Sequence, residues 1–259
     1  MHCTAVPLFI FDHDVTYANQ CVFVWCGCIP YNQAIQLQLK ICDLKKRGYE
    51  KDVLLLLEHP PVITLGRSAD RKNLLVSEDY LKNRGVDLWE TDRGGDITYH
   101  GPGQLVGYPI LSLHTGERDV RNYMRRLEES LMRLLHGYGI ESKRDTAFTG
   151  VWTEKGKIAA MGVHLSRWIT RHGFALNVHT DLSSFDLIVP CGIFGRGVTS
   201  MEKELRQRHD LRAVAERYTH EFEFVFKRHI IRLDRNKLLD DLEDYEKETG
   251  PVPGSAIPG

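Results

Sequence analysis

Val53-Leu54-Leu55-Leu56-Leu57 is the stretch of this chain that decides the class of fold. A continuous apolar run of this kind is typical of a β-strand that is buried on both faces. Pro60-Pro61 interrupts the run, and Val62–Leu65 resumes it. Since a sheet buried on both faces has to be covered, we expect helices to pack against it.

Helical and extended patterns alternate along the rest of the chain. Residues 31–47 repeat apolar side chains at three-four spacing before Gly48, and residues 120–136 carry the clearest apolar stripe. Further helices are expected from Ser77 to Arg84, from a capping box of Thr199 and Glu202, near 211–228 and over 234–247. Further strands are expected over Cys21–Cys26, Val86–Glu90, Leu105–Leu111 and His172–Val178, with a hairpin of Thr149–Trp152 and Ile158–Leu165 around Glu154-Lys155-Gly156. Hairpins and crossovers together predict an α/β (α+β) fold, a mixed β-sheet flanked by helices.

The composition is that of an ordinary globular protein. The 259 residues, of which 42% are hydrophobic, fit one large domain or one domain with a small appendage. The first stretch, 1–20, has the character of a loosely attached leader, and the tail from Gly250 to Gly259 is too rich in Pro and Gly to fold alone.

Charge and cysteine usage indicate where the protein works. A net charge of −1 gives no sign of a nucleic-acid or anionic-membrane partner. No Lys or Arg precedes Lys40, which disfavours a signal or transit peptide, and the uncharged stretch Val15–Leu39 holds too many Asn and Gln side chains to span a bilayer. The simplest setting is a reducing cytoplasm, in which the six cysteines form no disulfides. No Cys or His pairs stand at zinc spacing, so no metal site is expected.

Two segments contain candidate residues for ligand binding and catalysis. The first is the Gly-rich stretch Arg93–Gln104, whose backbone N–H groups can approach a ligand closely because no Cβ stands in the way. The second is Pro190-Cys191-Gly192, in which the cysteine is held in a turn that can present its sulfur to a ligand. Together they predict a thiol nucleophile facing an acyl-binding loop.

A cysteine nucleophile needs a base or a cation beside it, because the thiolate is the reactive form. Lys157, at the start of the predicted strand after Gly156, is one candidate, and His100 in the Gly-rich stretch is the other. Arg93 can anchor the loop or hold an anion. The other cysteines are interpreted as core filler: Cys3, Cys21, Cys26, Cys28 and Cys42. The residues alone support a cysteine acyltransferase or hydrolase.

Six blocks in order resemble the octanoyltransferases of lipoate synthesis, the lipoyl(octanoyl) transferase family. They are Arg93-Gly94-Gly95-x-x-Thr98-x-His100-Gly101-Pro102-Gly103-Gln104, Gly150-Val151-Trp152, Lys157-Ile158-Ala159-Ala160-Met161-Gly162, His172-Gly173-Phe174-Ala175-Leu176-Asn177, Pro190-Cys191-Gly192 and Gly197-Val198-Thr199-Ser200. The resemblance makes 21–226 the catalytic domain. The leader 1–20 and the stretch 227–259, a helical appendage with a loose tail, lie outside the pattern.

The resemblance implies a reaction and a site. Such enzymes move an octanoyl group from acyl carrier protein to a lysine of lipoyl domains, in 2-oxoacid dehydrogenases and in the glycine cleavage H protein, without a cofactor. By resemblance, Cys191 carries the acyl group as a thioester, and Lys157 lowers the pKa of its thiol. The implied substrate-binding residues are Arg93, Gly94, Gly95, Asp96, Ile97, Thr98, Tyr99, His100, Ala160, Met161, Gly162, Gly173, Phe174 and Ala175. The implied fold is the one shared by biotin and lipoate protein ligases.

Other assignments remain open at this point. An ATP-dependent lipoate–protein ligase would need no catalytic cysteine, an amidotransferase between lipoyl domains would keep one, and a non-enzymatic binding module would need neither Lys157 nor Cys191. Leu65, Met161 and Phe174 are expected walls of an apolar acyl tunnel. A basic rim for acidic carrier proteins is expected among Arg67, Arg71, Lys72, Arg167 and Arg171.

Overall fold

The computed structural model describes residues 19–190 and 196–250. Cys3, Cys191, most of the expected leader and nearly all of the Pro/Gly-rich tail lie outside the described residues. A large mixed sheet forms the centre of the molecule, with the strand order β11-β1-β2-β6-β10-β9-β8-β7. Its strands, in chain order, are β1 (Gln20–Cys28), β2 (Asp52–Glu58), β6 (Gln104–Ile110), β7 (Lys143–Arg144), β8 (Val151–Thr153), β9 (Gly156–Ser166), β10 (Ile169–Asn177) and β11 (His229–Leu233).

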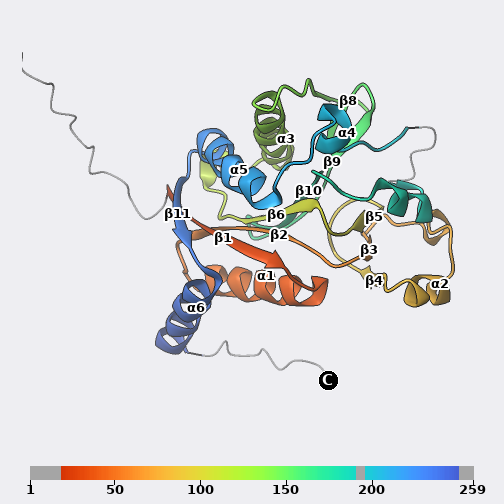
Figure 1. The fold of residues 1–259 in the computed structure, drawn as a ribbon. Coiled ribbons are helices and arrows are strands. Elements are labelled where there is room, and N and C mark those ends of the chain that lie inside the picture. The colour runs from red at the N-terminus through yellow and green to blue at the C-terminus, as the bar shows by residue number, and fades with distance from the viewer. Residues whose placement is uncertain (1–18, 191–195, 251–259) are drawn as a thin grey trace, which may run out of the picture.

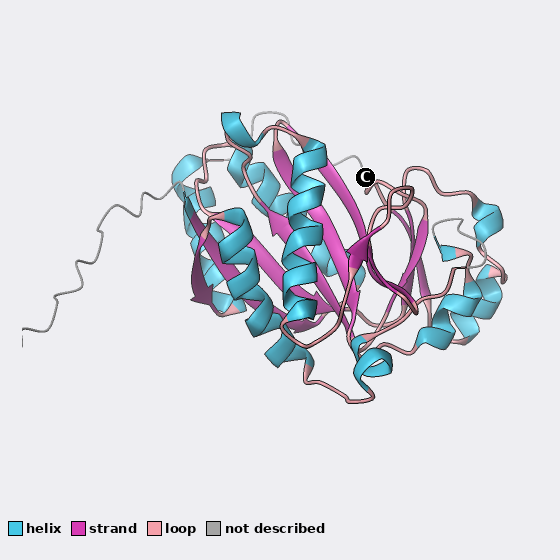
Figure 2. Ribbon diagram, turned by 90° about the horizontal axis from the view of Figure 1, so that it is seen from above, coloured by secondary structure: helices cyan, strands magenta, loops and turns pink. Residues whose placement is uncertain are grey.

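β2 has the two-sided burial that its apolar run predicts. Its residues alternate between two cores because successive side chains of a strand point to opposite faces. Leu54 and Leu56 pack into the core beneath the helices α3 (Val120–His136) and α5 (Leu211–Phe226). Val53, Leu55 and Leu57 pack into the core beside α1 (Tyr31–Lys46) and α6 (Arg235–Thr249). Figure 1 shows these helix pairs on the two faces of the sheet, and Figure 2 shows helices covering the face that is seen from above, which confirms the helix-covered mixed sheet.

The local signals for helix ends are largely confirmed. Ser77 caps α2 (Glu78–Asn83), since its side-chain oxygen accepts a hydrogen bond from the Tyr80 N–H. The expected capping box of Thr199 and Glu202 is wrong by one residue. Ser200 caps α4 (Met201–Leu205) by accepting from the Lys203 N–H, while the Thr199 hydroxyl donates to the Glu204 carboxylate at 2.8 Å.

A second, three-stranded sheet was not expected. It has the order β4-β3-β5, with β3 (Val62–Leu65), β4 (Asp87–Glu90) and β5 (Ile97–His100). β3 therefore does not resume β2 in the same sheet, because the chain leaves the large sheet at Pro60-Pro61. β5 occupies the middle of the stretch expected as a Gly-rich loop. The small sheet has a core of its own, which includes Ile63, Leu81 and Phe185, and lies at one end of the large sheet (Figure 1).

The chain after α5 belongs to the same fold. β11 pairs in parallel with β1, and Leu238 and Leu242 of α6 are fully buried in the core that α1 shares. The part of 227–259 that the structure describes is therefore integrated with the sheet, which corrects the expectation of a helical appendage. β11 gives no clear apolar pattern in the sequence, because its five residues are only partly buried at a sheet edge. No helix in the described ranges combines the length and apolar character needed to cross a membrane.

Candidate functional site

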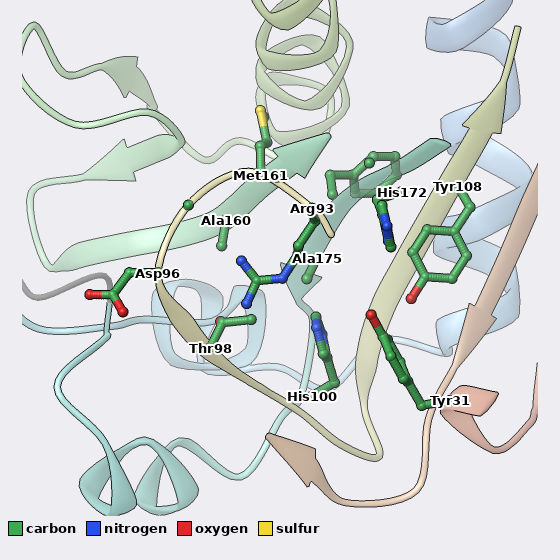
Figure 3. Close-up of a pocket in the computed structure, with 14 residues that line it drawn as sticks. Tyr31, Arg93, Asp96, Thr98, His100, Tyr108, Ala160, Met161, His172 and Ala175 are labelled. Carbon is green, nitrogen blue, oxygen red and sulfur yellow. The ribbon is translucent and has the colours of Figure 1, made fainter. Parts of the chain in front are cut away.

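A cavity opens where the two sheets meet. It contains about 480 Å³ of space that no protein atom occupies, part of which is open to solvent. Its walls come from β5, β6, β9 and β10, from the loop before β5 and from the first residue of α1 (Figure 3). The lining residues are Tyr31, Arg93, Gly95, Asp96, Thr98, His100, Tyr108, Ala160, Met161, Gly162, His172, Gly173, Phe174 and Ala175.

Most of the residues that the sequence assigned to substrate binding meet in this cavity. The exceptions are Gly94, Ile97 and Tyr99, which do not line it. Ile97 and Tyr99 alternate with Thr98 and His100 along β5, so they point into the core of the small sheet instead. Leu65, expected as a tunnel wall, is buried in that same core, whereas Met161 and Phe174 do line the cavity.

Arg93 anchors the Gly-rich loop to the small sheet. Its guanidinium donates to the Thr64 hydroxyl through Nε at 3.2 Å and Nη2 at 2.9 Å, and to the Thr64 carbonyl at 2.7 Å. The next residue, Gly94, donates its N–H to the Val163 carbonyl of β9 at 2.9 Å. Gly162 of β9 allows this approach, because a Cβ there would lie 2.6 Å from the Gly94 carbonyl oxygen. Arg93 therefore joins both sheets at the cavity.

His100, one of the two candidate bases, is held in the neutral form. Burial is the main cause that lowers its pKa, to about 3. Its Nδ1 lies 2.7 Å from the Gln104 side-chain oxygen, and the Gln104 amide donates to the Asn177 side-chain oxygen at 2.9 Å. Asn177 donates in turn to the Thr199 carbonyl at 3.0 Å. This chain of hydrogen bonds ties His100 to the backbone beside Lys157.

A second histidine of the cavity, His172, was not predicted as a site residue. Its Nε2 lies 2.8 Å from Asp92 Oδ1, and its backbone N–H donates to the Gln38 side chain. The His172 hydrogen bond is the largest cause that holds the Asp92 pKa well below its usual range, while burial lowers the pKa of His172. The only sequence signal for His172 is its place directly before Gly173 in one of the six family motifs. Tyr31 and Tyr108 had no such signal.

Lys157, the other candidate, lies at the second position of β9 and is buried. Its Nζ is 4.8 Å from the centroid of a Trp152 ring, an arrangement that stabilises a cation. Its backbone N–H donates to the Gly197 carbonyl, and its carbonyl accepts from the Thr199 N–H, both at 3.0 Å. The chain that follows Cys191 therefore returns beside Lys157.

The chain that precedes Cys191 is anchored to the cavity wall. The Val189 N–H donates to the Asn73 carbonyl at 2.7 Å, and the Asn73 side chain donates to Asp96 Oδ2 at 2.6 Å. Asp96 lines the cavity. Cys191 itself lies outside the described residues, but its two flanking segments are attached to Asp96 on one side and to Lys157 on the other.

The four described cysteines have raised pKa values. Burial is the main cause in each case and brings the pKa of Cys26 to about 12 and that of Cys42 to about 11. Burial also raises the pKa of Cys21 and Cys28. Thiols of this kind remain protonated at neutral pH and are poor nucleophiles. No group of three His, Cys, Asp or Glu side chains within 19–190 and 196–250 is arranged to hold a metal ion.

The expected basic rim is largely paired. Arg67 donates to His164 at 2.8 Å, Arg71 bridges Glu78 and Glu90, and Arg171 bonds to Asp92. Lys72 and Arg167 are exposed.

Comparison with known proteins gives consistent matches. Residues 30–223 match the model of the lipoyl protein ligase A/B catalytic domain. The chain is 51% identical to an octanoyltransferase of Koribacter versatilis over 84% of this chain and 89% of the relative, and 52% identical to that of Solibacter usitatus over 80% and 94%. Among solved structures, lipoate-protein ligase A bound with ATP superposes with a TM-score of 0.71 at 17% identity, covering 90% of this chain and 97% of that one. A bipartite lipoate protein ligase from Thermoplasma acidophilum reaches 0.69 at 17% identity, covering 92% and 99%. At such identities these structures establish a shared fold.

Proposed function

Because the chain belongs to the octanoyltransferases of the lipoyl protein ligase A/B catalytic-domain family, we propose that it moves an octanoyl group from acyl carrier protein to a lysine of lipoyl domains. Lipoyl domains of 2-oxoacid dehydrogenases and the glycine cleavage H protein are the proposed acceptors. Cys191 carries the acyl group between the two partners, and Lys157 favours the thiolate of Cys191. No cofactor takes part.

The observation that carries this proposal is the attachment of the two segments that flank Cys191. Val189 is held through Asn73 to the cavity residue Asp96, and Gly197 and Thr199 are held to the backbone of Lys157. This arrangement supports a thiol between an acyl cavity and a lysine ammonium. The raised pKa values of the four described cysteines support the same choice by elimination among those residues.

The transfer takes place in two balanced steps. The Cys191 thiolate attacks the carbonyl carbon of the donor thioester, and the carrier thiolate leaves. The acceptor lysine amine then attacks the new thioester, an amide forms, the Cys191 thiolate leaves, and the amine proton goes to a base. The first step exchanges one thioester for another, and the second forms a more stable amide, so neither step needs ATP. Burial of the acyl chain contributes about 0.8 kcal/mol per CH₂.

Mass spectrometry of the enzyme after incubation with octanoyl-carrier protein tests the proposal. We expect a gain of one octanoyl group that is lost in Cys191→Ser. Cys28→Ser is the matched control, since Cys28 is the exposed thiol among the described cysteines and should not be needed. A wild-type protein that remains unmodified would contradict the thioester mechanism.

Two alternative acyl donors distinguish the proposed activity from its rivals. Modification of a lipoyl domain from free octanoate and ATP, without acylated carrier protein, would indicate a ligase. Transfer from an octanoylated lipoyl domain at a higher rate than from octanoyl-carrier protein would indicate an amidotransferase. We expect octanoyl-carrier protein to be the best donor of the three.

A further inference from the structure

Tyr31, the first residue of α1, stands between two hollows. Its side chain lines the cavity, and it also lines an outer groove on the surface of the protein. The outer groove is defined by Tyr31, Ile35, Leu39, Trp89, Thr91 and Arg171, together with neighbouring polar residues. Leu39 is 46% exposed and Trp89 41%, so the groove offers apolar surface directly outside the cavity.

The Tyr31 ring is fixed in this place. It is 3% exposed, and its hydroxyl donates to the Thr91 hydroxyl at 3.1 Å. The ring stacks on His100 at a centroid distance of 6.3 Å and meets His59 edge-on at 5.3 Å. A buried ring held from three sides acts as a partition between the cavity and the groove.

The polar groups beside Tyr31 are already satisfied. His59 Nδ1 faces the Ile29 carbonyl at 2.7 Å, which can only accept, so Nδ1 carries the proton. Burial, the main cause, lowers the pKa of His59 to about 4, so the ring is neutral, and its Nε2 accepts from the Tyr108 hydroxyl at 2.8 Å. This end of the cavity therefore presents ring surfaces to a ligand and suits a hydrocarbon terminus.

The opposite side of the cavity is the side to which the segment before the proposed nucleophile Cys191 is attached. Asp96 is connected through Asn73 to Val189, which precedes Cys191 by two residues. Figure 3 shows Asp96 and Tyr31 on opposite sides of the cavity. An acyl chain attached at the Asp96 side would point its methyl end towards Tyr31.

We propose that Tyr31 sets the upper limit on the length of the acyl chain by closing the far end of the cavity against the outer groove. This inference rests on the proposed acyl transfer. Removal of the ring joins cavity and groove, so a longer chain can run out over Ile35, Leu39 and Trp89.

Acyl-carrier donors with chains of 8, 10, 12 and 14 carbons test this role, with the acyl-enzyme measured by mass spectrometry. The acylation rate of the wild type should be highest with the shorter chains and should fall with the longer ones. Tyr31→Ala should raise the ratio of the 12-carbon to the 8-carbon rate at least tenfold, since each additional methylene that becomes buried is worth about a fourfold gain. Tyr31→Leu, a milder change, should raise the same ratio less, and Tyr31→Phe should leave it unchanged because the ring remains.

Two further variants make the result specific. Tyr49→Ala removes another buried tyrosine, one that bonds to Asp241 of α6 and does not line the cavity, and it should keep the wild-type ratio. Adding Leu39→Asp to Tyr31→Ala should reduce the gained ratio by making the groove polar. An unchanged ratio in folded Tyr31→Ala and Tyr31→Leu, or an equal rise in Tyr49→Ala, would overturn the proposal.

Binding of free fatty acids separates this inference from the transfer reaction. Calorimetry should show that wild type prefers octanoate to dodecanoate and that Tyr31→Leu reverses or removes this preference. If octanoyl-carrier protein does not acylate the wild type, the proposed function fails, while calorimetry still decides the role of Tyr31. Equal binding of the two acids by wild type would count against a length limit at Tyr31.

Discussion

Arg93 shows how much a single side chain does at this site. Its guanidinium makes three hydrogen bonds to Thr64 of β3, while Gly94 beside it bonds to β9 of the other sheet. The fork of N–H donors in arginine matches these partners, and a lysine ammonium cannot reproduce it. The Gly-rich motif was recognisable from the sequence, but the role of Arg93 as an anchor for the loop depends on Thr64, 29 residues earlier.

Arg93→Lys should destabilise the fold and loosen the acyl cavity. Hydrogen bonds to a charged group contribute about 1.5–3 kcal/mol, and a lysine ammonium keeps only part of this. Chemical denaturation should show a loss of about 1–3 kcal/mol, together with slower acylation by octanoyl-carrier protein. Arg167→Lys on the exposed β9–β10 turn is the control and should change neither value. Wild-type stability in Arg93→Lys would show that the contacts to Thr64 are dispensable.

Lys157→Ala should raise the pKa of the proposed nucleophile Cys191, because it removes the positive charge that we propose favours the thiolate. The rate of alkylation by iodoacetamide between pH 6 and 9 measures this, in a Cys28→Ser background that removes the exposed competing thiol. We expect slower alkylation at neutral pH and a profile displaced to higher pH. Lys155→Ala, which removes the exposed lysine two residues earlier, is the matched control. Unchanged alkylation in Lys157→Ala would remove Lys157 from its proposed role.

At the scale of elements, strand alternation divides a motif between a core and a cavity. Thr98 and His100 of β5 face the cavity, whereas Ile97 and Tyr99 face the core of the small sheet. The resemblance marked the whole run as substrate-binding because a motif records sequence order and not the direction of side chains. The alternation of side chains between two faces can be predicted once β5 is known to be a strand. The glycines before β5, however, indicated a loop.

Gly107→Ala tests how closely β6 and β10 approach behind the cavity. Gly107 pairs with Phe174, and an added Cβ would lie 2.2 Å from the Phe174 ring, which would have to move from its place in the cavity wall. Overpacking of this kind costs about 1–3 kcal/mol. We expect that loss in chemical denaturation, with weaker binding of octanoate. Gly116→Ala is the control, because nothing lies within 4 Å of its added Cβ. Equal stability of both variants would contradict the close packing.

At the scale of the whole molecule, a buried ion cluster ties the C-terminal segment to the sheet. Asp52 of β2 bonds to Lys45 of α1 at 2.8 Å and to Arg228, directly before β11, at 2.9 Å. All three side chains are at most 4% exposed. Arg228 also forms an ion pair with Glu117, at 2.6 Å. The cluster joins segments from both ends of the described chain.

Asp52→Asn should strongly destabilise the protein. It leaves the Lys45 ammonium buried without the carboxylate that it pairs with, while Arg228 keeps only Glu117. Breaking a buried pair in this way costs about 3–5 kcal/mol. Urea denaturation measures the loss. Asp244→Asn breaks the exposed pair with Lys247 and should cost less than about 1 kcal/mol. Similar losses in the two variants would show that burial of the cluster does not matter.

Mild acid should destabilise the fold through two buried histidines. Burial lowers the pKa of His59 to about 4 and that of His100 to about 3, from an ordinary 6.5. Below pH 6.5 the unfolded chain therefore binds protons that the folded chain does not. The free energy of unfolding should fall between pH 6.5 and 4, by up to about 1.4 kcal/mol per pH unit for each histidine. Denaturation at several pH values should show a shallower slope in His59→Gln and an unchanged slope in His136→Gln, whose side chain is 80% exposed. An unchanged slope in His59→Gln would contradict its neutral state.

The sequence by itself determined the mixed sheet covered by helices, most helix ends and the motif residues that meet in the cavity. The sheet and the helix ends depend on local spacing, because apolar periodicity and capping groups act over a few residues, whereas the motif residues were implied by the resemblance to a family. Only the tertiary structure decided the second sheet, the place of β11 and the far wall of the cavity. Tyr31 reaches Thr91 across 60 positions, and the His172 backbone reaches Gln38 across 134. Which strands pair and which side chains meet depends on packing between such distant segments, and no local pattern encodes it.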